Sequence, residues 1–425
     1  MFQNLYTESL EKRYDCAKAY FKALGVDTDA AIATMLDTAI SLHCWQGDDV
    51  KGFEVHEESV SGGGIMATGN YPGPALDANT LRKDAEKAFS LIPGKKRFNL
   101  HAIYAETNGK VVDRDQIGPE HFANWMAWSK ANGIPLDFNP TFFAHPKAND
   151  GYTLSHADDE IRNFWIRHDK RCRRIAEAMG KNQGCACVVN HWAPDGAKDQ
   201  PIDRWSPRKR LMESLDEIFA EKIDPAYCKD AVECKLFGIG SEDYVVGSHE
   251  FYLGYALTRP QMVCLDMGHF HPTENIYDKI SAVLLYKPEL LLHVSRGIRW
   301  DSDHVVILND DIRCLFQQIV RGGALSKVNI ALDFFDASIN RVGAWTIGTR
   351  CAQKGLLSAL LEPTEMLLTF ENANDGAMKL ALLEELKTAP VSAVWDMFCK
   401  QSNVPGGAEW IDNLIDYDRN VIKKR

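Results

Sequence analysis

The stretch MVCLDMGHF, residues 262–270, shows the pattern that decides the fold. It begins with a short, nearly continuous apolar run, as expected for a strand that is covered on both faces. Asp266 ends this run, and His269 follows three residues later, after Gly268. In a parallel barrel the carboxyl ends of the strands meet at the active site. We therefore predict a strand that carries two potential ligands to such a site.

Seven further apolar runs share this pattern, and helical segments separate several of them. The runs cover residues 41–48, 98–106, 136–143, 186–192, 233–240, 290–295 and 328–335. Eight strands that alternate with helices predict an α/β fold, a parallel (β/α)₈ TIM barrel with additional helices. A chain of 425 residues is long enough for such a barrel and for further elements.

Start and stop signals predict the ends of several connecting helices. Asn79 is expected to cap a helix before the second strand. Pro119 stands where a first helical position would be, and Gly133 is the expected stop of that helix. Ser155 with Asp158 matches a capping box at the start of a long helix. These helices would lie between successive strands of the barrel.

The pattern changes near residue 340, and we predict a division of the chain there. Residues 1–340 are expected to form the barrel together with an N-terminal helix. After Asp336 the apolar positions follow a wholly helical pattern. Residues 341–425 are therefore predicted to form a helical C-terminal extension, which packs on the barrel or on a neighbouring subunit.

Composition and charge exclude several classes of protein. The net charge of −11 argues against a surface for nucleic acid or anionic membranes, because both need a basic footprint. No apolar stretch approaches the roughly 20 residues that span a bilayer. The eleven cysteines form no C-x-x-C pair and lie mostly in apolar runs. We therefore expect reduced thiols and a cytoplasmic protein.

Acidic and histidine residues at five consecutive strand ends form a candidate site for two divalent metal ions. Side-chain alternation places Glu233 with Lys235, and Asp301 with Asp303, on the same face of a strand. Carboxylates and imidazoles without thiolates favour Mn²⁺, Mg²⁺ or Co²⁺ over a structural zinc site. A single D-x-D pair is weak evidence, whereas convergence from five strands is strong. The predicted ligands are Glu233, Asp266, His269, His293, Asp301, Asp303 and Asp333.

Lys235 has two interpretations. It is either a salt-bridge partner of Glu233 or a fixed cation that polarises a substrate carbonyl. Its position between predicted metal ligands favours the second interpretation.

Aromatic residues and a histidine end several of the other predicted strands. Each alone is typical of a core, but together they predict a wall against which the C–H faces of a sugar can stack. They are Trp45, His101, Phe143, Trp192 and Phe335. The glycine-rich loop at 61–73 matches neither a P-loop nor a dinucleotide fingerprint, so we predict a folded loop over the site.

Several strings of the sequence closely resemble the bacterial L-rhamnose isomerases, along essentially the whole chain. The segments that carry the resemblance are SLHCWQGDD (41–49), GGIMATGNYPG (63–73), FNLHAIY (98–104), TLSHADD (153–159), KLFGIG (235–240), GHFHPTE (268–274), RWDSDHVV (299–306) and LDFFDASINR (332–341).

The resemblance implies a xylose-isomerase-type barrel, a homotetramer, and conversion of L-rhamnose to L-rhamnulose with two divalent ions, Mn²⁺ or a substitute such as Co²⁺, Mg²⁺ or Zn²⁺. It implies a structural metal held by Glu233, Asp266, His293 and Asp333. It also implies a catalytic metal held by His269, Asp301 and Asp303, with Asp266 bridging. The expected contacts to the sugar come from Lys235, His101 and Trp192, with Phe335 against the methyl group.

Two routes and three rival functions remain open at this stage. Hydrogen moves between C2 and C1 of the open-chain sugar, either as a hydride or as a proton through an enediol, and His101 or Asp333 assists ring opening. The first alternative is another aldose isomerase of the same fold. The second is a metal-dependent hydrolase or phosphodiesterase on such a barrel, which would be expected to show basic residues for phosphate. The third is a sugar-binding protein without catalysis, which would need no metals.

Overall fold

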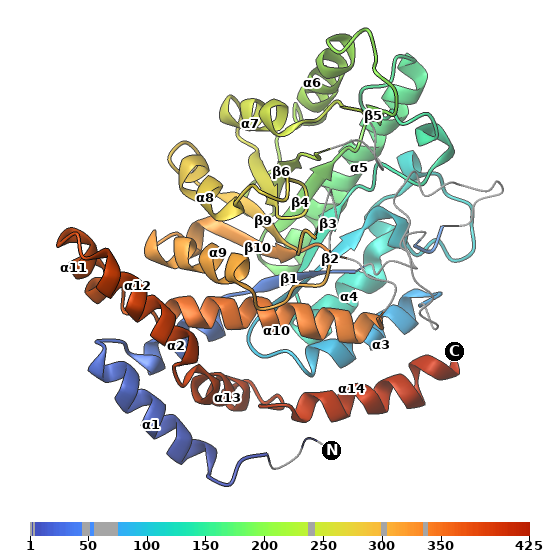
Figure 1. The fold of residues 1–425 in the computed structure, drawn as a ribbon. Coiled ribbons are helices and arrows are strands. Elements are labelled where there is room, and N and C mark those ends of the chain that lie inside the picture. The colour runs from blue at the N-terminus through green and yellow to red at the C-terminus, as the bar shows by residue number, and fades with distance from the viewer. Residues whose placement is uncertain are drawn as a thin grey trace.

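Eight parallel strands close into a barrel at the centre of the computed structural model (Figure 1). The structure describes residues 2, 5–44, 52–54, 75–236, 243–298, 304–334 and 339–425. The order around the barrel is β1-β10-β9-β8-β6-β4-β3-β2, and every neighbouring pair is parallel. The predicted (β/α)₈ barrel is confirmed.

The barrel strands are short, as expected for strands buried on both faces. They are β1 (Ile40–His43), β2 (Lys96–His101), β3 (Leu136–Asn139), β4 (Cys187–Trp192), β6 (Cys228–Glu233), β8 (Met262–Asp266), β9 (Leu290–Val294) and β10 (Val328–Leu332). A separate antiparallel pair consists of β5 (Gly196–Ala197) and β7 (Tyr244–Val245).

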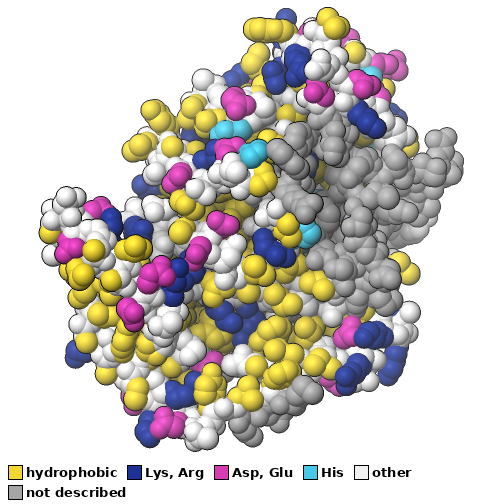
Figure 2. All heavy atoms as spheres, viewed as in Figure 1, with side chains coloured by type: hydrophobic (Ala, Val, Ile, Leu, Met, Phe, Trp, Pro, Cys, Tyr) yellow, Lys and Arg dark blue, Asp and Glu magenta, His cyan; other side chains and the backbone are white. Residues whose placement is uncertain are grey.

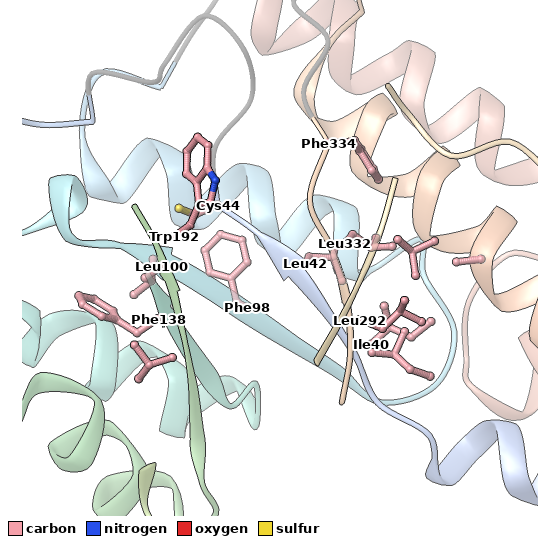
Figure 3. Packing of buried hydrophobic residues seen from close by; sticks show 14 of the residues in the cluster. Ile40, Leu42, Cys44, Phe98, Leu100, Phe138, Trp192, Leu292, Leu332 and Phe334 are labelled. Carbon is pink, nitrogen blue, oxygen red and sulfur yellow. The ribbon is translucent and has the colours of Figure 1, made fainter. Parts of the chain in front are cut away.

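Alternate residues of each barrel strand face two different environments. One set packs against the surrounding helices in a large hydrophobic cluster, to which Leu42, Leu292 and Leu332 belong. Figure 3 shows these side chains close together on neighbouring strands. The other set faces the barrel axis, where a small cluster contains Ala231 and Cys264. The polar residues at the strand ends continue this second set.

The fifth barrel strand lies earlier in the chain than its prediction. We expected a strand over 233–240, but β6 covers Cys228–Glu233, so Glu233 ends the strand instead of beginning it. Lys229 and Asp230 interrupt the apolar pattern of β6 and therefore hid it. Asp230 can lie in a buried strand because Arg173 and His191 pair with it.

Helices surround the barrel on all sides (Figure 1). They are α3 (Ala78–Phe89), α4 (Ala123–Asn132), α5 (Asp159–Gln183), α6 (Ser206–Ile218), α7 (His249–Leu257), α8 (Ile276–Leu284), α9 (Asp310–Arg321) and α10 (Arg341–Leu360). The helix α10 follows the last barrel strand and packs against α9 and α3. It therefore completes the ring of helices.

Two predicted helix starts were wrong, and one predicted end is confirmed. Asp77, not Asn79, caps α3, because its carboxylate accepts from the Thr80 backbone. Asp158 caps α5, while the hydroxyl of Ser155 instead donates to the buried Asp195 at 2.5 Å. Gly133 ends α4 with φ 63°, in the left-handed region that favours glycine.

The remaining α-helices lie outside the ring, along the left side and the bottom of Figure 1. They are α1 (Leu10–Ala23), α2 (Thr28–Asp37), α11 (Thr364–Asn372), α12 (Gly376–Glu385), α13 (Val391–Gln401) and α14 (Glu409–Asn420). The helix α13 packs against α1, α2 and α10. Asp84 of α3 accepts from Tyr417 and Arg425, which fastens the C-terminal end of the chain to the barrel helices. Among helices of the described residues, none has the length and hydropathy to cross a membrane.

Candidate active site

Four ionisable side chains meet inside the barrel, at the carboxyl ends of consecutive strands. Glu233 ends β6, Asp266 ends β8, His293 lies near the end of β9, and Asp333 follows β10. One ligand atom from each of them lies within 4.8 Å of those of the other three. We call these four residues the inner cluster. The structure therefore brings together four of the seven residues predicted as metal ligands.

The ring of His293 lies at the centre of the inner cluster. Its Nδ1 is 3.5 Å from Glu233 Oε1, 3.4 Å from Asp266 Oδ2 and 3.3 Å from Asp333 Oδ2. This nitrogen forms no hydrogen bond of good geometry with the described residues. A single ring N–H could serve only one of three carboxylates. The positions of these atoms therefore fit a cation bound by all four side chains better than a ring N–H that is hydrogen-bonded to one carboxylate.

Neighbouring polar groups orient the carboxylates of the inner cluster. Asn190 donates to Glu233 Oε2. Ser295 Oγ and the backbone N–H of Gly268 donate to Asp266 Oδ1, at 3.0 and 2.6 Å. Neither Asn190 nor Ser295 was predicted from the sequence. The sequence did contain a signal for them: Asn190 lies two residues from Trp192 and Ser295 two residues from His293, so each shares the strand face of a predicted site residue.

His269, Lys235 and Trp192 lie together beside the inner cluster. His269 Nδ1 is 2.8 Å from Glu233 Oε1 and 3.0 Å from the carbonyl of Cys234. Lys235 Nζ is 3.4 Å from His269 Nε2 and lies 5.0 Å from the centre of the Trp192 ring. The rings of Trp192 and His269 stack at 5.9 Å. The rings of Trp192 and His269 thus form an aromatic wall at the same end of the barrel as the inner cluster.

His101 ends β2 and is buried, with its Nδ1 3.2 Å from Thr141 Oγ1. Burial disfavours the charged imidazole and outweighs the attraction of Asp333, so the pKa of His101 falls to about 3. The imidazole is therefore neutral at pH 7. Phe143 packs against Trp192 at 5.6 Å, on the same side of the barrel mouth.

Some predicted site residues lie outside the part of the chain that the structure describes. They are Trp45, Asp301, Asp303 and Phe335, together with the glycine-rich loop at 61–73. Their predicted roles stay predictions.

The chemistry of the inner cluster fits a divalent cation. Three carboxylates and one imidazole are the oxygen and nitrogen ligands that Mn²⁺ and similar ions take. Burial alone would raise the pKa of Glu233, but His293 and His269 outweigh burial and lower it to about 2. Ionised carboxylates buried without arginine or lysine among the four members need a cation to balance them.

Comparison with known proteins gives one consistent family. A family model described as L-rhamnose isomerase (RhaA) matches residues 8–425. The L-rhamnose isomerase of Rhodopirellula baltica is 56% identical over 417 residues, which cover 98% of this chain and 97% of that protein. The L-rhamnose isomerase of Escherichia coli O127:H6 is 55% identical over 419 residues, covering 99% of this chain and 100% of that protein.

Solved structures with similar architecture have much lower sequence identity. An L-ribulose 3-epimerase has a TM-score of 0.46 at 11% identity, covering 75% of this chain and 95% of its own. A xylose isomerase domain protein of Alicyclobacillus acidocaldarius has a TM-score of 0.45 at 10% identity, covering 76% and 99%. The fold assignment rests on the closed strand order, not on these likenesses.

Proposed function

This chain belongs to the L-rhamnose isomerase family, and on that premise we propose that it converts L-rhamnose to L-rhamnulose with the help of divalent metal ions. The main observation that supports this proposal is the inner cluster, whose four potential ligand atoms lie within 4.8 Å of one another. The enzyme is thus an aldose–ketose isomerase. This reaction fits a barrel opening that is lined by the inner cluster, a lysine and aromatic rings.

We propose that Glu233, Asp266, His293 and Asp333 hold one metal ion, and that Mn²⁺ is the natural one. His269, Asp301 and Asp303 are proposed for the second ion, with Asp266 bridging. When bound, such ions act as Lewis acids toward the oxygens of the open-chain sugar. The close approach of His269 to Glu233, at 2.8 Å, supports the proposal because it places this imidazole next to the first site.

Side chains around the ions would bind and orient the sugar. Trp192 offers an aromatic face, and its buried indole N–H forms no hydrogen bond with the described residues, so it is available to a sugar hydroxyl. Lys235 would hold a positive charge beside the carbonyl oxygen. Either the neutral His101 or Asp333 is proposed to assist ring opening, through a hydrogen bond to the ring oxygen or to a hydroxyl of the sugar. We also propose Trp45 and Phe335 as walls of the sugar site.

Hydrogen transfer between C2 and C1 can follow either of two routes on this site. Lys235, which lies beside the inner cluster, would balance negative charge that develops on the substrate oxygens in both routes. Solvent deuterium at C1 of the product would support an enediol, and its absence would support a hydride shift.

The charge on the described part of the face seen in Figure 2 argues against the rival hydrolase. Figure 2 shows basic and acidic side chains interspersed on the visible face, not gathered into a basic patch for phosphate groups. We further propose a homotetramer and a cytoplasmic location. The eleven cysteines all lie in the described residues and none of them forms a disulfide, which supports a reducing compartment.

The decisive experiment measures L-rhamnulose formation by purified protein that has been stripped with EDTA and resupplied with Mn²⁺. We expect metal-restored turnover, and its loss in Asp301→Asn. Asp216→Asn is the matched control, because Asp216 is half exposed, pairs with Arg259 and Tyr255, and lies on α6 outside the barrel. No turnover by folded, metal-loaded protein would overturn the proposed substrate.

A further inference from the structure

Arg114 is a buried arginine that connects two loops near the sugar site. It opens a short 3₁₀ helix (Arg114–Gln116) between β2 and α4, and its residue surface is 1% exposed. Its Nε and Nη2 donate to the two carboxylate oxygens of Glu54, both at 2.8 Å. Glu54 follows Phe53, whose backbone N–H donates to the carbonyl of Ile103 just after β2. One side of the guanidinium thus holds the segment 52–54.

The other side of the guanidinium holds the loop that follows β3. Nη1 donates to the carbonyls of Thr141 and Phe143, both at 2.6 Å, and Nη2 donates to that of Ala144 at 2.9 Å. With the two bonds to Glu54, all five N–H donors of the guanidinium are used. No lysine could replace them, because an ammonium group has three donors and no planar fork.

The loop held by Arg114 has an unfavourable backbone conformation. Thr141 has φ 65° and Ala144 has φ 52°, a region that non-glycine residues seldom adopt. Such conformations persist only where surrounding contacts enforce them. The three carbonyls bound by Arg114 lie within this short segment, so the guanidinium supplies part of that enforcement.

The same loop supports two predicted sugar contacts. Thr141 Oγ1 lies 3.2 Å from His101 Nδ1 and so sets the orientation of that ring. Phe143 packs against Trp192 with ring centres 5.6 Å apart. Trp192 in turn stacks on His269 and lies under Lys235. A shift of the loop would therefore move both the imidazole and the aromatic wall.

We propose that Arg114 is a positioning residue for the sugar site: its guanidinium locks the loop at 141–144 so that His101 and Trp192 meet the open-chain sugar in the correct geometry. The inference rests on the proposed function, because it takes L-rhamnose as the ligand. Arg114 itself touches neither the sugar nor the inner cluster, and acts through the loop.

The test compares Arg114→Lys with Arg173→Lys in Mn²⁺-loaded protein. Arg173 is a matched control, since it is also buried and binds one carboxylate, Asp230, and two carbonyls, but on the outer side of the barrel. Misplaced binding groups cost up to about 100-fold in rate, so we expect KM for L-rhamnose to rise about tenfold in Arg114→Lys. Arg173→Lys should lower thermal stability and leave KM unchanged.

If Arg114 only stabilised the fold, the kinetics of Arg114→Lys would be different. Loss of folded enzyme lowers kcat at constant KM, so a folded Arg114→Lys with KM within twofold of the natural protein would overturn the proposal. An equal rise of KM in Arg173→Lys would overturn it as well. If Arg114→Lys does not fold, Glu54→Gln serves instead. We expect its KM to rise about threefold, and an unchanged KM would overturn the proposal.

Two further variants extend the test, and the spectroscopic measurement made with the second one does not depend on the proposed function. Adding Ala144→Gly to Arg114→Lys should lower KM at least about threefold, because glycine adopts the left-handed conformation without the guanidinium. The near-ultraviolet circular dichroism of Trp192, obtained by difference from Trp192→Phe, should be lost in Arg114→Lys and kept in Arg173→Lys. An inactive natural protein would defeat the proposed function alone, whereas a retained Trp192 signal in Arg114→Lys would defeat this inference alone.

Discussion

Two buried clusters of acidic and histidine residues lie on opposite faces of the same barrel wall. The inner cluster faces the barrel axis. The second, which we call the outer cluster, lies between the wall and α5 and consists of Asp169, Arg173, His191 and Asp230. Asp169 and His191 are at most 1% exposed. Both clusters thus combine carboxylates with a buried histidine.

The clusters differ in how their charges are balanced. In the outer cluster His191 lies 2.9 Å from Asp169 and 3.0 Å from Asp230, and Arg173 makes a two-pronged pair with Asp230. Burial disfavours a charged His191, but the two aspartates outweigh burial and raise its pKa to about 9. Burial likewise opposes ionisation of Asp230, and His191 and Arg173 overcome it to lower the pKa to about 2. Two cations therefore balance two anions.

The inner cluster has three carboxylates around one imidazole and no arginine or lysine among its members. Since a buried charge is costly unless it is paired, this excess of anions indicates a place for a cation. The comparison teaches that a buried group of titratable residues suggests a metal only where the protein itself leaves the charge unbalanced.

The largest expected effect comes from altering the inner cluster. Asp266→Asn should lower kcat/KM about 1,000-fold or more, because bound metal supplies several kcal/mol of transition-state stabilisation. The fold should persist, since the outer cluster and the hydrophobic cluster are untouched. Turnover, metal content and the melting temperature in EDTA check this together. Near-normal turnover with reduced metal content would show that the inner cluster has no part in catalysis.

Altering the outer cluster should instead affect stability. Arg173→Met leaves Asp169 and Asp230 with His191 as their remaining cation, and breaking a buried pair costs about 3 kcal/mol or more. Activity per folded molecule should stay within about twofold, because none of these residues faces the barrel axis. Urea unfolding of the metal-free protein measures the first effect, and initial rates measure the second. A 100-fold loss of kcat at unchanged stability would contradict the division between the clusters.

The pKa of His191 predicts how stability depends on pH. Because the pKa of about 9 in the folded protein exceeds the usual 6.5, the folded state binds the proton more tightly than the unfolded state. This contribution, about 3 kcal/mol from a rise of this size, is complete below pH 6.5 and is lost as pH rises through 9. Between pH 6 and pH 9.5 the unfolding free energy of His191→Gln should therefore decline less steeply than that of the natural protein. If stability depended on pH in the same way in both proteins, the ion pairs of His191 with Asp169 and Asp230 would be refuted.

The smallest expected effect is proton competition for metal at the inner cluster. Burial disfavours the charged ring of His293, but the carboxylates of Glu233, Asp266 and Asp333 outweigh burial and raise its pKa well above its usual range. A metal must displace this proton, so Mn²⁺ affinity should fall about tenfold for each unit of decreasing pH near neutrality. Calorimetric titration at pH 6, 7 and 8 measures the slope. A pH-independent affinity would exclude His293 as a ligand.

The sequence predicted the inner cluster better than the outer one. Asp266 and Asp333 follow apolar runs, and parallel strands bring such positions together whatever the details of packing. The outer cluster gave no such signal, because Asp169 lies on a helix and Arg173 one turn later on the same helix. Its member Asp230, together with Lys229, interrupts the apolar pattern of β6, so the fifth strand was predicted at 233–240 instead of Cys228–Glu233.

Local patterns by themselves determined the barrel, the strand-end positions of Asp266 and Asp333, and the Gly133 helix end, because apolar runs, side-chain alternation and left-handed glycine act over a few residues. Only the tertiary structure decided that Asp77 caps α3, that Ser155 serves Asp195, and that Arg114 joins Glu54 to the loop after β3. Each of these is a choice between competing hydrogen-bond partners. Such choices depend on which groups folding brings within about 3 Å of one another, and spacing along the chain does not specify that.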